Sequence, residues 1–239
     1  METRYLEAEA VLVRAEALAI AAKDWDRLSR LYMPLQEVRR QRRQRCGEGI
    51  VCLDLIAEGP DDRLEARHVL ENYPHGQLLV AGWGSIEPAI AVRDMAAAHG
   101  LYVETFLAAT YPALGGNVVV IVPLGDVNLP EPRVQSVEEL SGRLPPNCLI
   151  YRVGDLPPGP RKGTFQTYGQ VMAMWERLHL PFLAEADGRS SLIEKTMGYR
   201  QTIRVDYACE LAHQKLSDVA RDLAREALEK AAPAALSSR

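Results

Sequence analysis

The stretch QLLVAGWGSIEPAIAVRDMAAAHGLYVETFLAA, residues 77–109, decides the fold of this chain. Its first six residues are apolar enough for a strand that is buried on both faces, and GWGS at 82–85 is a sharp turn. Residues 86–99 carry apolar side chains at helical spacing, and residues 102–109 return as a second strand. This order predicts one βαβ unit, whose ligand would lie at the carboxyl ends of the strands.

The GWGS turn is the first candidate ligand site. Gly82 and Gly84 let a ligand approach the backbone, and the next helix would offer its N–H groups and Ser85 to an anion such as phosphate. The dinucleotide fingerprint is not matched, because Glu87 stands where a third glycine is required. The strand–GxGS–helix order is similar to the opening of SIS domains, a resemblance that implies a phosphosugar-type ligand. The alternative is a structural turn in which Ser85 caps the helix.

The residues around this unit extend the same pattern. Further strands are expected at 50–57, 118–123 and 148–153, and further helices at 61–72 and 136–144. The third and fourth strands are joined by a loop short enough for a hairpin, so one antiparallel pair is expected. The sequence therefore predicts an α/β fold with a mostly parallel sheet of about five strands, flanked by helices at both ends of the chain.

The N-terminal residues 2–45 predict a hairpin of two helices, in which Asp24 caps the second helix and Pro34 kinks or divides it. The run ALAIAAKDWDRLSRLYMPL is similar to the turn between the helices of a tetratricopeptide repeat, over about residues 8–44. It departs from that repeat at Leu28 and Pro34, and no second copy follows. Because such repeats need several units to bury a shared core, one hairpin is expected to pack on its own domain.

The C-terminal part is expected to be helical again. One helix should begin at Thr164 and end near Pro181, and a capping box of Ser191 or Ser190 with Glu194 should start the next. Gly198 is the expected division of the long stretch 190–231. The predicted organisation is a helical hairpin at 1–46, an α/β core at 47–163, and C-terminal helices at 164–239 that pack on the core.

Two aspartates follow candidate strands in matched sequence contexts. Asp126 and Asp155 each come after an apolar run and precede Leu-Pro or a similar loop. Carboxylates at strand ends would hold Mg²⁺ or act as a catalytic acid and base. The alternative is a Gly-Asp turn in which each aspartate bonds its own backbone. Antiparallel strands would place the two carboxylates at opposite ends and remove the shared site.

The loop GPRKGT at 159–164 supplies further cations. Arg161, Lys162 and Thr164 precede a helix and suit an anionic ligand, although the order differs from that of a P-loop. The whole segment 154–163 is rich in proline and glycine and is expected to be a loop. The alternative is a flexible basic loop in which Thr164 caps the next helix.

Two further patterns have structural alternatives. Carboxylate–histidine pairs spaced for one helical turn occur at Glu65-x-x-His68, Glu176-x-x-His179 and Glu210-x-x-His213, with Glu16 and Glu194 as additional carboxylates. Such pairs hold di-iron or di-manganese centres in helical bundles, and they also occur as surface contacts. Five arginines in residues 39–45 would contact phosphates of RNA or bind a partner protein, would pair with the chain's own acidic surface, or would form a solvated helix face, which a net charge of −4 favours.

Composition excludes few functions. The chain has 239 residues, of which 47% are hydrophobic, and no run approaches the ~18 apolar residues of a membrane span. The start lacks the apolar segment of a signal peptide, so a cytoplasmic protein with reduced cysteines is expected. Nucleic acid is not an expected partner outside the arginine run, because the net charge is negative.

Three functions follow as hypotheses. The first is a small-molecule protein that binds a phosphorylated or anionic ligand through Gly82, Gly84 and Ser85, with Arg161 or Lys162 neutralising charge. The second is a non-catalytic interaction or oligomerisation module that uses the terminal helices. The third is a metal protein built on the carboxylate–histidine pairs. Neither the ligand nor a reaction can be read from the sequence.

Overall fold

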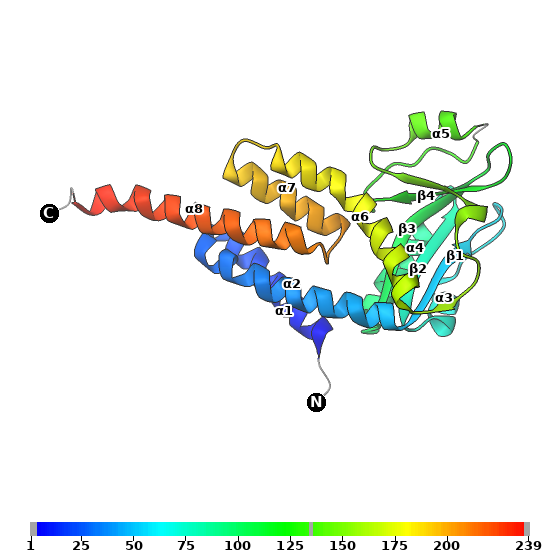
Figure 1. Ribbon diagram of the computed structural model, residues 1–239, viewed down its shortest axis with the longest axis horizontal. Coiled ribbons are helices and arrows are strands. Elements are labelled where there is room, and N and C mark those ends of the chain that lie inside the picture. The colour runs from blue at the N-terminus through cyan, green and yellow to red at the C-terminus, as the bar shows by residue number, and fades with distance from the viewer. Residues whose placement is uncertain (1–3, 134–135, 237–239) are drawn as a thin grey trace. The chain divides into compact units, whose positions relative to one another are not determined.

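The computed structural model describes residues 4–133 and 136–236, with side chains as far as residue 230 (Figure 1). Its helices are α1 (Tyr5–Ala21), α2 (Trp25–Glu48), α3 (Ala66–Asn72), α4 (Glu87–Ala98), α5 (Val137–Arg143), α6 (Phe165–Asp187), α7 (Leu192–Val205) and α8 (Glu210–Leu236). Its strands are β1 (Ile50–Ile56), β2 (Gly76–Trp83), β3 (Val103–Tyr111), β4 (Val118–Val122), β5 (Leu149–Arg152) and β6 (Arg161–Lys162). The five strands expected from the sequence match β1 to β5 within two residues at each end.

The chain divides into two compact units. The helical unit comprises Met1–Arg42 and His179–Arg239, and the sheet unit comprises Arg43–Leu178. The division falls inside α2 and α6, and the domain boundaries proposed from the sequence stay a prediction. In the described part of the chain, no helix combines the length and the apolar character that crossing a membrane requires.

The sheet unit contains one six-stranded sheet in the order β5-β4-β3-β2-β1-β6. Strands β1, β2 and β3 are parallel, whereas β4, β5 and β6 each pair antiparallel with their neighbours. The α/β class and the terminal helices are confirmed, but the sheet is mixed, so the prediction of a mostly parallel sheet is wrong. Strands β4 and β5 are joined by a long connection that contains α5, which is usual between parallel strands, yet the two strands pair antiparallel. The length of a connection alone does not fix the direction of the next strand.

The sixth strand corrects a second prediction. Residues 161 and 162, expected in a loop, pair with the first two residues of β1: Lys162 lies opposite Ile50, and Arg161 opposite Val51. The next amide, Gly163 N–H, donates to the Gly49 carbonyl at 2.8 Å. A strand of two residues has no periodicity that a sequence could display, which explains why the pairing was not foreseen.

The two faces of the sheet carry different chemistry. On the face covered by α3 and α4, alternate strand residues such as Leu78, Val80, Leu107 and Val120 form an apolar core with Val92 of α4. Side chains alternate between faces along a strand, so the intervening residues point to the other side. That side is covered by the end of α2 and the first part of α6, both within the sheet unit.

This second face buries an ion pair. Arg43 donates hydrogen bonds to both carboxylate oxygens of Glu104, and each side chain is only 2% exposed. Gln77 donates to the same carboxylate at 2.5 Å. The Arg43 guanidinium lies 4.9 Å from the Trp175 ring centroid, and Trp175 stacks on Phe106 with centroids 4.2 Å apart. The pair thus ties α2, α6 and the sheet together.

The helical unit has its own apolar core. Leu28 and Tyr32 of α2, Leu183 of α6, Ile203 of α7 and Leu216 of α8 are all buried in it. α7 and α8 pack against each other along this core (Figure 1). The terminal helices therefore form a bundle that buries a shared interior.

Sequence signals at helix starts are confirmed. The Arg27 amide donates to Asp24 Oδ1 at 3.0 Å, which caps the first turn of α2. Ser191 and Glu194 form a reciprocal capping box at the start of α7. The starts of α2 and α7 are therefore fixed by hydrogen bonds between residues close in sequence, which makes them predictable from the sequence.

The predicted helix end near Pro181 and the predicted division at Gly198 are wrong, and Pro34 does not divide α2, whereas a kink there stays a prediction. α2 continues through Pro34 and α6 through Pro181, because buried residues on both sides keep each helix packed. Gly198 lies inside α7, where a Cβ atom would approach Ala186 Cβ to 2.6 Å, so this glycine permits close packing of α6 and α7. The actual division between α7 and α8 is at Asp206, whose Oδ1 accepts a hydrogen bond from the Ala208 amide at 3.1 Å.

We expect the buried ion pair to govern the stability of the sheet unit. Glu104→Gln keeps the side-chain shape but leaves the Arg43 charge uncompensated, which should lower the free energy of unfolding by about 3–5 kcal/mol in urea titrations. Replacing both partners, Arg43→Met with Glu104→Leu, should recover much of this loss.

The half-exposed pair of Arg45 and Glu48, 3.4 Å apart, provides the control. Glu48→Gln should cost less than about 1 kcal/mol, because exposed ion pairs contribute little. Equal losses for Glu104→Gln and Glu48→Gln would contradict the importance assigned to the buried pair.

Candidate functional site

The GWGS turn uses its amides within the protein. Gly84 N–H donates to a β3 carbonyl at 2.9 Å, Ser85 N–H to the Gly82 carbonyl at 3.4 Å, and Glu87 N–H to Ser85 Oγ at 3.2 Å. Gly84 has a φ of +60°, and a side chain there would meet the ring of Pro132 at 2.8 Å. These contacts match the alternative of a structural turn, although Ile86 and not Ser85 is the N-cap of α4, and anion binding at this turn stays a prediction.

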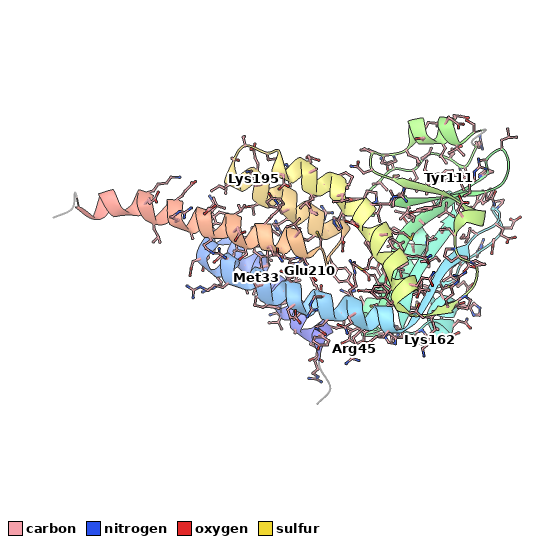
Figure 2. The ribbon with its side chains drawn as sticks, in the orientation of Figure 1. Met33, Arg45, Tyr111, Lys162, Lys195 and Glu210 are labelled. Atoms are coloured by element: carbon pink, nitrogen blue, oxygen red, sulfur yellow. The ribbon has the colours of Figure 1, made fainter. Side chains whose placement is uncertain are left out.

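The predicted cations and the GWGS turn lie at opposite ends of the sheet strands. Arg161 and Lys162 pair with the beginning of β1, whereas the GWGS turn follows the end of β2, which is parallel to β1. Figure 2 shows Lys162 well separated from Tyr111, the last residue of β3. Thr164 caps α6 by accepting a hydrogen bond from the Thr167 amide at 3.2 Å. The structure therefore does not bring these residues to the turn.

The two predicted aspartates are also separated. Asp126 follows β4 and Asp155 follows β5, and these neighbouring strands are antiparallel. The carboxylates therefore flank opposite ends of the strand pair, and the shared acid–base or Mg²⁺ site is not assembled. Asp155 lies at the same end of the sheet as the last residue of β3. Two strands, β4 and β3, separate its strand β5 from β2, which precedes the GWGS turn. Separate roles for the two residues stay predictions.

The arginine run is not the solvated helix face that the sequence favoured. Arg39 is 8% exposed and donates to Glu9 at 3.0 Å, and Arg43 is 2% exposed in its pair with Glu104. Arg42 also donates to Glu9, at 2.8 Å. Three of the five arginines, Arg39, Arg42 and Arg43, thus form ion pairs with glutamates distant in sequence. The run therefore does not form a broad phosphate-binding surface.

The carboxylate–histidine pairs do not converge. Glu65, Glu176 and Glu210 are exposed, and no group of three metal-ligating side chains occurs among the described residues. Glu16, considered as a further ligand, accepts hydrogen bonds from Tyr32 and Arg200, both at 3.2 Å. The remaining carboxylate, Glu194, belongs to the capping box of α7.

His179 is instead paired with the aspartate that divides α7 from α8. Its Nδ1 lies 2.6 Å from Asp206 Oδ2, and Asp206 is 1% exposed. Burial alone would lower the pKa of His179, but the hydrogen bond to Asp206, the neighbouring Cys209 side chain and the Asp206 charge raise it to about 9. The imidazole is therefore protonated at neutral pH.

His213 has the opposite character. It is fully buried, its Nδ1 lies 2.8 Å from the Cys209 carbonyl oxygen, and its Nε2 lies 3.1 Å from Arg39 Nη1. Burial lowers the pKa of His213 to about 4, and the Arg39 charge acts in the same direction, against the hydrogen bond to Cys209. The two histidines of this network are thus held in different protonation states.

An open pocket of about 610 Å³ lies in the helical unit. It is formed by the turn between α1 and α2, the first half of α7, and the part of α8 that follows Leu223. Its lining residues are Ile20, Lys23, Trp25, Ile193, Thr196, Met197, Arg200, Leu223, Glu226, Ala227 and Lys230. This volume is within the range of binding sites, and the wall is mostly apolar.

Sequence reasoning did not identify this pocket. Its residues come from three segments, 20–25, 193–200 and 223–230, and the first lies more than 160 positions before the second, so no local motif reveals it. The features that mark the pocket appear only in the structure: Lys23, two residues after the end of α1, has a φ of +53° where glycine or asparagine is usual. Ile193 and Met197, one turn apart on α7, are 46% and 61% exposed.

The two histidines predict a maximum of stability near pH 6.5. The folded pKa of His179 lies above its ordinary value of 6.5, so its contribution is complete below that pH and is lost as the pH rises through about 9. The folded pKa of His213 lies below 6.5, so stability falls as the pH drops from about 6.5 toward 4. Thermal unfolding temperatures measured from pH 4 to 10 check both the acidic and the alkaline limb of this stability profile.

Single substitutions separate the two limbs. His179→Gln should flatten the alkaline limb and His213→Gln the acidic one, whereas His68→Gln, at an exposed position, should change neither. An alkaline limb that persists in the His179 variant would contradict this assignment.

Comparison of the chain with protein-family models, with curated proteins and with solved structures gives no match in any of the three. Any proposal for the function of this chain must therefore rest on the geometry of its own residues, chiefly on the pocket of the helical unit.

Proposed function

We propose that this chain is a non-catalytic docking module, whose helical unit binds an acidic amphipathic helix of a partner protein. The observation that carries the proposal is the pocket between the α1–α2 turn, α7 and α8, which combines an apolar wall with cations at its rim. Grooves of this kind take the apolar face of a helix, with residues at one-turn spacing as anchors.

The shape of the pocket supports a helical occupant. Ile193 and Met197 are one turn apart on α7, and Leu223 and Ala227 are one turn apart on α8, so two ridges bound the groove. The buried stripe of α8 ends at Leu223, and Ala227 continues it as an exposed residue. Met197 adds a flexible side chain of the type that adapts to binding partners. The groove therefore offers the surface that an additional helix would cover.

The charges at the rim favour an acidic occupant. Lys23, Arg200 and Lys230 line the pocket, of which Arg200 also pairs with Glu16 at 3.2 Å, and Glu226 is the one acidic residue among the lining residues. Glu226 and Lys230 are 3.4 Å apart and exposed, which leaves both available to solvent or to a partner. Opposite charges on a partner would increase both the association rate and the selectivity.

Lys23 supports a role beyond stability. A lysine with positive φ costs about 1 kcal/mol relative to a residue in an ordinary conformation, and glycine would relieve this cost. The lysine side chain is exposed at the edge of the pocket. Strained residues of this type concentrate at functional positions, because binding there offsets the loss of stability.

A second copy of the chain is a less complementary occupant. Residues 210–230 of α8 contain five acidic and four basic residues, so its surface is nearly neutral. A small anionic molecule would contact the cations but would not cover the two apolar ridges that Ile193 with Met197 and Leu223 with Ala227 present. Binding experiments with peptides and pocket variants distinguish a second copy and a small anion from an acidic helix.

We expect a synthetic amphipathic peptide with leucines on one face and glutamates on the other to bind at least about tenfold more tightly than the same peptide with lysines. Trp25 lies in the pocket, so a change in its fluorescence would report the binding, with Trp25→Phe removing the signal. Binding should weaken as salt concentration increases.

Matched variants locate the binding site. Met197→Glu should abolish binding, whereas Met33→Glu, which alters an exposed methionine outside the pocket, should not (Figure 2). Lys23→Gly should weaken binding about three- to tenfold while it raises the free energy of unfolding by up to about 1 kcal/mol. Lys195→Gln, which removes a charge outside the pocket, should leave the affinity unchanged.

Three outcomes would contradict the proposal. Equal affinity for the two peptides would remove the role of charge, and equal effects of Met197→Glu and Met33→Glu would remove the pocket. A concentration-dependent dimer in sedimentation experiments that Met197→Glu disrupts would assign the groove to a second copy instead.

A further inference from the structure

The two edge strands of the sheet, β5 and β6, are protected differently against the addition of another strand. β6 consists of two exposed cations, Arg161 and Lys162. Charged side chains on an edge strand discourage further pairing. β5 has the sequence LIYR, which contains neither proline nor glycine, and its first three residues are bulky and only partly buried. Of the two edges, the one at β5 is therefore better suited to accept a further strand.

The hydrogen bonding of β5 directs alternate backbone groups away from the sheet. The Val153 amide donates to the Asn117 carbonyl at 3.1 Å, so this pair and every second pair between β4 and β5 are hydrogen-bonded. The intervening residues of β5, Ile150 and Arg152, therefore point their amides and carbonyls outward. Within residues 4–133 and 136–236, these outward groups have no hydrogen-bond partner. They form a row of donors and acceptors that an added strand would pair.

We propose that β5 pairs antiparallel with β5 of a second copy of the chain, so that two sheets become continuous in a symmetric dimer. The twofold axis passes between the two Ile150 residues, which exchange their outward backbone hydrogen bonds. Arg152 of each copy then lies opposite Cys148 of the other, the residue directly before β5. This register satisfies the outward backbone groups of both strands.

The side chains of β5 are complementary to one another in this register. On one face the two Ile150 side chains meet, and each Arg152 faces Cys148, so no two arginines lie directly opposite each other. On the other face Leu149 lies opposite Tyr151, an aromatic–aliphatic pair of the type that stabilises neighbouring strands. Like charges directly opposite would oppose the pairing, and this arrangement avoids them. A second copy therefore matches β5 in both backbone and side chains.

Sedimentation of the full chain over a wide range of protein concentrations tests the dimer. Arg152 has a φ of −70°, which proline also adopts, and its amide points away from β4. Arg152→Pro therefore removes a donor from the proposed interface and none from the pairing with β4. It should weaken dimerisation at least about tenfold, because the symmetry removes the donor twice. Arg152→Ala keeps the amide and should weaken dimerisation less than about threefold, since an exposed charge contributes little.

Three results of this experiment would overturn the proposal. They are a native chain that stays monomeric at every concentration, equal effects of Arg152→Pro and Arg152→Ala, and a dimer that Met197→Glu disrupts. The last variant alters the pocket of the helical unit and should leave the β5 dimer intact. The dimer and the binding of an acidic helix are thus tested separately, and either can fail without the other.

A disulfide test fixes the register and does not depend on the folding of the proline variant. Opposite residues of a hydrogen-bonded antiparallel pair have Cα atoms about 5.5 Å apart, within the span of a disulfide. Arg152→Cys with oxidised glutathione should therefore give a covalent dimer, linked to the native Cys148 of the second copy. Adding Cys148→Ser should abolish the link. A link that persists in the double variant, or no link in Arg152→Cys, would contradict the proposed pairing.

Discussion

A carboxylate that is removed from water must meet a cation or enough hydrogen-bond donors, and this constraint organises both units of the chain. Four acidic side chains, Glu9, Glu16, Glu104 and Asp206, are at least 92% buried. Each has such a partner: arginines for the three glutamates and a histidine for the aspartate. The pairs join helix to helix in one unit and helix to sheet in the other, so removing one partner would disturb packing over several elements.

The same constraint separates structural charges from charges that are available for binding. Arg39 and Arg43 belong to a sequence that resembles a phosphate-binding run, yet both are used inside the protein. Lys23 and Lys230 belong to no charge run, yet both are exposed at the rim of the apolar pocket. The density of charge along the sequence is therefore a poor guide to the surface that meets a partner, and the position of each charge relative to buried acids is a better one.

Much of the fold could be predicted from local patterns. The apolar runs gave five strands, the GWGS turn gave a strand followed by a helix, and Asp24 and Ser191 marked helix starts, because each signal lies within a few residues. The direction of β5, the two-residue β6 and the burial of Arg43 against Glu104 depend on contacts between residues far apart in sequence. The pocket and the His179–Asp206 pair were missed for the same reason, since their members come from segments far apart in the sequence.

We propose that the helical unit binds its partner through the groove formed by the α1–α2 turn, α7 and α8. Hydrogen–deuterium exchange of the full chain, with and without the glutamate-bearing amphipathic peptide, locates the binding surface. We expect protection of backbone amides concentrated at 193–200 and 223–230. Protection at the 82–85 turn of the sheet unit instead, or no protection at saturating peptide, would contradict it.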